Sequence, residues 1–314
     1  MVVSMKTFPR REELIAATHT PFHEDGSLNL DAISTQADAL LNRGIQTVFI
    51  CGTTGESASL TVAERKAVTQ RWMEVVPGTP MQVIAHVGHM CQQDAIELAA
   101  SAASSGVQAV AAISPSFFKP ANVEDLTTFL EPIAAAAPDL PFYYYDIPVM
   151  TNVSLPMVAF LEHAGKRIPN LAGLKYTNGD AMQLQEIVRY GEGQYEIFSG
   201  FDEVLLTSLA LGVKGAVGST YNFAAPLYLQ LIGAFEQGDL ETARRLQAES
   251  VKLVRVLVGF GFMAAAKATM ELLGVPVGPP RPPLRPLTSD EKKKLEAALH
   301  EQGLWSYLQP IPKM

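Results

Sequence analysis

One lysine stands at the end of an apolar run, in the stretch GLKYTNGD at residues 173–180. Lys175 follows glycine and leucine, and polar residues come directly after it. A lysine amine that burial keeps uncharged can attack a carbonyl carbon and form a Schiff base. A lysine at a strand end can also reach water and carry no chemistry, so other parts of the sequence must decide between these two interpretations.

A tyrosine at the end of the preceding apolar run favours the chemical interpretation. Tyr145 closes PFYYY at 141–145, and its phenol could shuttle protons during imine formation and carbon–carbon cleavage. The structural alternative is a core aromatic side chain with a hydrated tip. Tyr143 shares a strand face with Tyr145 but lies two residues deeper, so we expect Tyr143 to serve packing.

The stretch GTTGE at residues 52–56 is a candidate anion cradle. Two glycines flank Thr53 and Thr54 ahead of a predicted helix, where backbone N–H groups, hydroxyls and the helix dipole favour a carboxylate. A capping turn with Glu56 in a structural bond is the alternative. Alone, this stretch favours the capping turn.

These groups follow apolar runs that read as buried strands. The predicted strands are 14–18, 47–51, 82–86, 108–113, 141–145, 172–175, 196–199 and 215–218. Apolar residues spaced by three and four predict helices at 30–43, 62–75, 93–105, 123–137, 156–164, 181–190, 202–211 and 227–237. Eight alternating pairs predict an α/β fold, a (β/α)8 TIM barrel, and no GxGxxG supports an open doubly wound sheet.

Further helical patterns follow the barrel, at 241–259, 264–273 and 289–303. We therefore expect residues 1–238 to form the barrel and residues 239–314 to form a C-terminal helical extension packed on it. The segment 275–287 holds six prolines and reads as an extended connector. Thr61 and Ser154 precede helical patterns and are predicted helix caps.

Composition narrows the class of protein. The 314 residues are 48% hydrophobic and 18% charged, with a net charge of −8, which argues against a nucleic-acid partner. Two cysteines suit a reducing compartment. The N-terminal stretch lacks the pattern of a signal peptide, and no apolar run has the length of a membrane span. We expect a cytoplasmic protein without a membrane partner.

Together, the motifs resemble the class I, Schiff-base pyruvate aldolases, a family that includes dihydrodipicolinate synthase and N-acetylneuraminate lyase. The resemblance runs from about residue 12 to beyond residue 285 and is carried by ATHTPF (17–22), GTTGES (52–57), YYYDIPVMT (143–151), GLKYT (173–177) and GSTYN (218–222). It implies the barrel and a homotetramer. It also implies that Lys175 forms the imine, Tyr145 relays protons, and Thr53 and Thr54 hold the carboxylate of pyruvate.

Two positions depart from the synthases. These usually carry an arginine where this chain has Met150, and a tyrosine where it has Phe117. The segments SGFDE (199–203) and VGSTYN (217–222) are similar to the lyases instead. The substrate-binding residues that this likeness implies are Thr177, Gly200, Asp202, Glu203 and Ser219. Adjacent carboxylates offer several acceptors to a polyhydroxyl chain, although acidic residues also favour helix starts.

We therefore expect a lyase-type aldolase that cleaves a sialic acid to pyruvate and N-acetylmannosamine. Asp146 and Asn152 depart from the lyase pattern, so an aldolase or dehydratase for another 2-keto-3-deoxy sugar acid stays open. Dihydrodipicolinate synthase and a non-catalytic barrel that binds a keto acid are further alternatives.

A metal site is a weaker interpretation of HVGHMC at 86–91. His86, His89 and Cys91 offer ligand atoms but no clear carboxylate partner. A protonated imine would itself accept the electrons of the broken bond. We expect no metal and no separate cofactor, and small-molecule partners only: pyruvate and a sugar-derived aldehyde.

Overall fold

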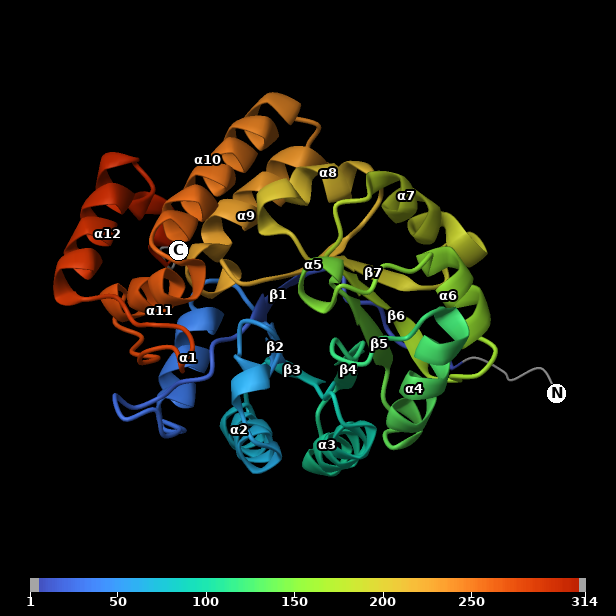
Figure 1. Cartoon of the computed structure of the whole chain (residues 1–314). Helices are drawn as coiled ribbons and strands as arrows, with labels where there is room; N and C mark the ends of the chain where they lie inside the picture. Colours follow the sequence, from blue (N-terminus) through green and yellow to red (C-terminus); the bar gives the residue numbers. More distant parts are fainter. Residues whose placement is uncertain (1–5, 311–314) are drawn as a thin grey trace.

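A closed barrel of eight parallel strands forms the centre of the molecule (Figure 1). This computed structural model describes residues 6–310. Each strand pairs with the next along the chain, and β8 pairs with β1. The strands are β1 (Leu14–Ala17), β2 (Thr47–Ile50), β3 (Gln82–His86), β4 (Ala109–Ile113), β5 (Phe142–Asp146), β6 (Leu171–Tyr176), β7 (Glu196–Ser199) and β8 (Gly215–Gly218). The predicted (β/α)8 class is confirmed.

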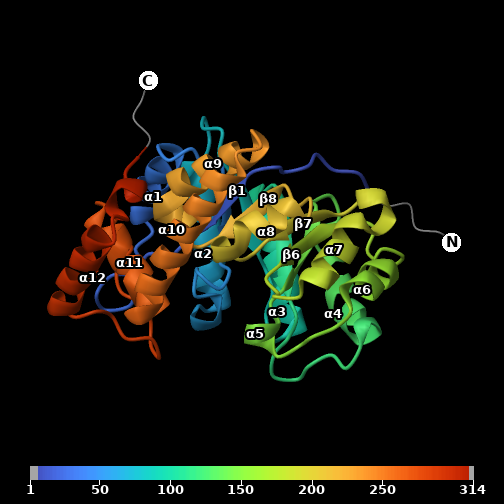
Figure 2. The ribbon, with the colours of Figure 1, turned by 90° about the horizontal axis from the view of Figure 1, so that it is seen from above.

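Helices surround the barrel and continue after it. Those between or after strands are α1 (Ala32–Leu41), α2 (Val62–Val75), α3 (Gln92–Ser105), α4 (Val123–Ala135), α5 (Pro148–Thr151), α6 (Met157–Ala164), α7 (Ala181–Arg189), α8 (Leu205–Ala210) and α9 (Tyr221–Glu236). The C-terminal helices are α10 (Leu240–Gly259), α11 (Phe262–Leu272) and α12 (Ser289–Glu301). Seen from above, α10–α12 gather with α1 and α9 on the side of the barrel away from α4 and α6 (Figure 2).

Two layers of core explain why the strands read as continuous apolar runs. Side chains pointing inward, among them Phe49, Ile84 and Tyr145, fill the barrel. The alternate side chains, such as Val48 and Tyr144, pack against the helices. Strands buried on both faces gain from apolar residues at every position. Tyr143 lies with Tyr145 among the inward-pointing side chains, which confirms that the two share a strand face.

A polar cluster closes the amino-terminal end of the barrel. Tyr143 donates to Glu196 Oε2 at 2.5 Å and accepts from Arg11 Nη1 at 3.0 Å. Burial and the neighbouring carboxylate raise the pKa of Tyr143, so the phenol stays protonated and remains a donor. Tyr143 thus serves the structure, as predicted, at the end of the barrel opposite Tyr145.

Several local predictions are corrected by tertiary context. The last barrel helix begins at Tyr221 rather than at 227, because Ala224 (φ −121°) introduces a kink that accommodates Pro226 inside it. The pattern at 202–211 is a 3-10 turn, η3 (Asp202–Val204), followed by α8, because Val204 is not helical.

Two predicted caps have different outcomes. Thr61 caps α2 and forms a reciprocal capping box with Glu64. Ser154 is not a cap, because α6 begins after Pro156. The first amide of α6, that of Met157, instead donates to Gln183 Oε1 at 2.6 Å. Among residues 6–310, no single helix is long and apolar enough to cross a membrane; α10 and α11 meet those criteria only as a pair bent by 108°.

Candidate active site

Lys175 and Tyr145 are direct partners across the pairing of β5 with β6. The Nζ atom of Lys175 lies 3.9 Å from the ring centroid of Tyr145 and 4.9 Å from that of Phe49. The lysine is 5% exposed, so aromatic rings rather than water surround its amine. Phe49 was not predicted as part of this site. Its inward position on β2, three residues before the cradle, was the available signal.

The GTTGE loop brings the two threonines to the same end of the barrel. Thr53 is exposed, and its Oγ1 lies 3.4 Å from the Tyr145 hydroxyl. Thr54 is buried, and its Oγ1 hydrogen-bonds to Ser219 Oγ at 2.6 Å. Three hydroxyl groups and the phenol therefore converge from β2, β5 and β8.

One expectation about this loop is wrong. The loop does not lead directly into a helix, because the 3-10 turn η1 (Ser57–Ser59) and an extended Leu60 separate it from α2. The amino-terminal amides of α2 are capped by Thr61 and do not serve the loop. The cradle therefore relies on its own amides and hydroxyls rather than on the dipole of α2.

Thr177 and Gly200 face one another at the ends of β6 and β7. A Cβ atom on Gly200 would lie 1.8 Å from Thr177 Oγ1, so only glycine allows the threonine this position. The threonine hydroxyl is buried and has no partner among the described residues. A buried hydroxyl without a partner is costly unless a ligand or water completes it, which suits the expected role of Thr177 near the substrate.

The two adjacent carboxylates have different surroundings. Asp202 is buried, and its Oδ2 accepts from the amide of Thr220 at 2.8 Å and from the Thr220 hydroxyl at 2.6 Å. Burial raises the pKa of Asp202 to about 6. Glu203 is half-buried and has no ion pair or hydrogen bond within the described part of the chain. One oxygen of Asp202 therefore supports the β8–α9 turn, whereas both carboxylate oxygens of Glu203 are free for a ligand.

Asp146 lies on the strand face opposite Tyr145. It is buried, accepts from Asn178 Nδ2 at 3.2 Å, and has a pKa that burial raises to about 6. Asn152 adopts φ 53°, the left-handed conformation that asparagine tolerates. Met150 and Phe117, the two departures from the synthases, are 61% and 78% exposed.

His86, the last residue of β3, and His89 in the loop after it are engaged in ways that do not suit a metal. His86 Nδ1 lies 2.9 Å from the carbonyl oxygen of Cys51, and burial together with the charge of Arg65 keeps the His86 pKa well below its usual range. The ring packs edge-on against Tyr145, with centroids 6.1 Å apart. His89 pairs instead with Asp94. No three potential ligands gather anywhere between residues 6 and 310 in a metal-binding arrangement.

Polar and titratable side chains thus meet at the carboxyl ends of β2, β5, β6, β7 and β8, where barrels of this class place their chemistry. The fold and this arrangement define a (β/α)8-barrel enzyme. The chain belongs to the dihydrodipicolinate synthetase family, whose sequence model matches residues 10–302.

Individual proteins of known name are also similar to this chain. The chain is 40% identical over 298 residues to N-acetylneuraminate lyase of Danio rerio, covering 93% of this chain and 97% of the relative. The solved structure of Proteus mirabilis N-acetylneuraminate lyase superposes with a TM-score of 0.91 and 42% identity, covering 94% of this chain and all of that one. The Aliivibrio salmonicida N-acetylneuraminate lyase, a sialic acid aldolase, gives a TM-score of 0.90 and 41% identity, with 96% and 98% coverage.

Proposed function

We propose that this enzyme is an N-acetylneuraminate lyase-type class I aldolase that cleaves a sialic acid to pyruvate and N-acetylmannosamine. The observation that carries the proposal is the buried Lys175 amine above the Tyr145 ring, at 3.9 Å from its centroid. An amine surrounded by apolar and aromatic atoms is suited to attack a ketone. The neighbouring phenol is within reach of the carbons next to that ketone.

In the proposed reaction, Lys175 attacks C2 of the open-chain substrate and water leaves, which gives a protonated imine. Tyr145 takes up the proton of the C4 hydroxyl as it passes its own proton, through the hydroxyl of the exposed Thr53 3.4 Å away, to solvent. The C3–C4 bond breaks, its electron pair enters the imine, and the aldehyde departs. The resulting enamine takes one proton from solvent at C3, and water then adds to the imine carbon, which releases pyruvate and restores the amine.

Each of the remaining groups binds a different part of the substrate. Amides and hydroxyls of Thr53 and Thr54 bind the carboxylate at C1. Thr177, whose hydroxyl is otherwise unpaired, contacts the reacting hydroxyl region. Glu203 supplies acceptors to the hydroxyl tail beside Gly200 and Ser219, and Asp202 contributes its remaining oxygen, Oδ1, which has no partner among the described residues.

The other candidates have weaker support. A lysine-precursor synthase needs a cation for the second carboxylate, and Met150 provides none. A non-catalytic keto-acid binder has no need of a lysine and a phenol together. An aldolase for another 2-keto-3-deoxy sugar acid is the second candidate, because Asp146 and Asn152 depart from the lyase pattern.

We also propose a homotetramer in the cytoplasm, with residues 239–310 acting as one extension of the barrel; residues 311–314 of the expected extension lie outside the described part of the chain. Large apolar side chains stand exposed on the β4–α4 loop and on α5, which suits contact with another copy; these are Phe117, Phe118, Val149 and Met150. Both cysteines are free thiols, as a reducing compartment would keep them. Light scattering of the purified protein tests the assembly.

Borohydride trapping tests the chemistry directly. Reduction in the presence of pyruvate is expected to fix pyruvate on Lys175, detectable by peptide mass spectrometry, and no adduct would favour the binding protein. A panel of aldehydes offered with pyruvate then identifies the substrate. Condensation with N-acetylmannosamine supports the lyase, an unacetylated sugar aldehyde supports the second candidate, and aspartate semialdehyde supports the synthase.

A further inference from the structure

The loop that carries Thr53 and Thr54 ends in a buried carboxylate. Glu56 follows them in the left-handed conformation, with φ 54°, which is uncommon for a residue with a side chain. Only 3% of its side chain is exposed. A buried carboxylate requires a cation or several hydrogen-bond donors. For Glu56, both come from the C-terminal part of the chain.

Lys267 of α11 provides the cation. Its Nζ lies 2.8 Å from Glu56 Oε1, and the lysine side chain is 1% exposed. The other oxygen of Glu56 accepts from the backbone amide of Arg281 at 2.8 Å. Lys267 also donates to the carbonyl of Pro279 at 2.9 Å. One carboxylate therefore joins the cradle loop to α11 and to the proline-rich connector, residues 275–287.

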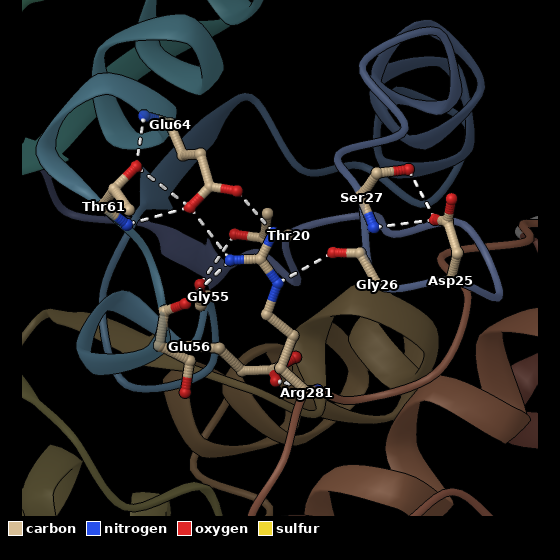
Figure 3. Close-up of polar contacts among 10 residues, drawn as sticks. Thr20, Asp25, Gly26, Ser27, Gly55, Glu56, Thr61, Glu64 and Arg281 are labelled. Carbon is tan, nitrogen blue, oxygen red and sulfur yellow. Dashed lines mark hydrogen bonds and ion pairs between the residues drawn. The ribbon is translucent and has the colours of Figure 1, made fainter.

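The side chain of Arg281 forms a second attachment (Figure 3). Its Nε donates to the carbonyl of Gly26 at 2.9 Å, and its Nη1 donates to the carbonyl of Ser59 at 2.8 Å. Its guanidinium also pairs with Glu64 of α2. Figure 3 shows this group reaching from the connector between the β1–α1 loop and the start of α2. Arg281 thus fixes the segments on both sides of the cradle.

The ring of Phe22 contacts both cations. Its ring centroid is 4.3 Å from Lys267 Nζ and 4.4 Å from Arg281 Cζ. Its amide donates to the carbonyl of Val277 at 3.1 Å. At Gly278 (φ 68°), a Cβ atom would lie 1.8 Å from the Phe22 carbonyl oxygen, so the connector can approach this closely only through glycine.

Backbone bonds transmit the position of Glu56 to the threonines. The Glu56 amide donates to the carbonyl of Thr53 at 3.0 Å, and the Ser57 amide donates to that of Gly52 at 3.2 Å. Thr20 Oγ1 holds the carbonyl of Gly55 at 2.7 Å. Because these bonds tie Glu56 to the carbonyls of its own loop, we expect a shift of Glu56 to displace both threonines.

We propose that Lys267 and Arg281 are positioning residues that, by fixing Glu56, set the place of Thr53 and Thr54 for the carboxylate of the keto acid. The proposal rests on the proposed function, since it assumes that this loop binds pyruvate. Loss of Lys267 leaves a buried carboxylate without a cation, so Glu56 moves toward water and draws the loop with it. Lys175 and Tyr145 lie on other strands and keep their places.

The test measures the pyruvate concentration that gives half-maximal borohydride trapping on Lys175. For Lys267→Met we expect this concentration to rise at least about tenfold, while the trapping rate at saturating pyruvate stays within about twofold. The double variant Glu56→Gln, Lys267→Met removes both charges and is expected to recover much of the affinity, because no unpaired charge remains. Lys292→Met removes a half-exposed ion pair with Glu271 in the same extension and serves as the matched control.

Glu64→Gln provides a milder variant if Lys267→Met does not fold. It weakens the attachment of Arg281 but preserves the capping box of α2, in which glutamine can replace glutamate. A severalfold rise in the half-saturating concentration is expected. Values equal to wild type for both folded variants, or for Glu64→Gln when it alone folds, would overturn the positioning role. Failure of wild type to be trapped would instead refute the proposed function.

Discussion

The amine of Lys175 lies over the ring of Tyr145, with 3.9 Å between Nζ and the ring centroid, because the two residues are paired across neighbouring parallel strands. This relationship fixes the distance between the proposed nucleophile and the proposed proton carrier through the barrel itself rather than through a loop. Groups held by regular elements keep their geometry better than groups on mobile segments. Substitutions at either residue are therefore expected to change chemistry more than folding.

Replacement of Lys175 by arginine or glutamine tests the covalent step. Neither side chain can form the imine, so we expect turnover to fall by at least about 10³-fold and borohydride trapping to disappear. Circular dichroism and thermal unfolding establish that each variant is folded. Full turnover in either variant would exclude a Schiff base at this position.

Tyr145→Phe tests the proton relay. Without the phenol, kcat is expected to drop by about 10²–10⁴-fold, whereas the pyruvate concentration for half-maximal trapping changes little. Steady-state kinetics and trapping separate these two effects.

Tyr143→Phe is the matched control, because it removes the same hydroxyl two residues away on the same strand face. That hydroxyl bonds Glu196 and Arg11 at the other end of the barrel. The expected result is a loss of about 1–3 kcal/mol in the free energy of unfolding with kcat within about twofold of wild type. Equal kinetic losses in both variants would show that Tyr145 acts through packing.

Gly200→Ala tests the contact between β7 and Thr177. The added methyl group would lie 1.8 Å from Thr177 Oγ1 and displace it. We expect kcat/KM for sialic acid cleavage to fall about 10–100-fold, with pyruvate trapping retained. Gly179→Ala is the control, since nothing lies within 4 Å of its Cβ position. Similar kinetics for the two variants would remove Thr177 from the substrate site.

The sequence predicted the strands and the closeness of Lys175 to Tyr145 because both follow from local patterns and strand order. Strands buried on both faces are continuous apolar runs, and consecutive strands in a βα repeat are neighbours. The adjacency of Lys175 and Tyr145 followed from that order. Helix boundaries near Pro226 and Val204 were harder to predict, because the backbone departs there from the helix that the local periodicity indicates.

Contacts between residues far apart in the chain could not be predicted from the sequence. Glu56 was predicted only to make some structural bond, and nothing in its surroundings indicated Lys267 or Arg281 as partners. Asp202 likewise stood out as a substrate ligand, although its carboxylate is largely occupied by Thr220. Such pairs depend on how α9, α11 and the connector pack on the barrel, which periodicity does not encode.

The buried Asp202 gives a prediction about pH. Burial raises its pKa from 3.8 to about 6 in the folded protein, so the folded state binds more protons than the unfolded state between these values. The contribution of Asp202 to the free energy of unfolding is therefore fully present below pH 3.8 and is lost as the pH rises through about 6. The loss is at most about 3 kcal/mol, because one pKa unit corresponds to about 1.4 kcal/mol.

Asp202→Asn removes this titration and retains an acceptor for Thr220. The unfolding temperature of the variant relative to wild type is therefore expected to increase from pH 4 to pH 7.5. Asp146, whose pKa is also about 6, titrates in both proteins and cancels in the difference. Differential scanning calorimetry across this range measures the effect. If the difference between the two unfolding temperatures does not change with pH, the charge on Asp202 carries no desolvation cost. Its carboxylate must then gain a compensating partner in the folded protein.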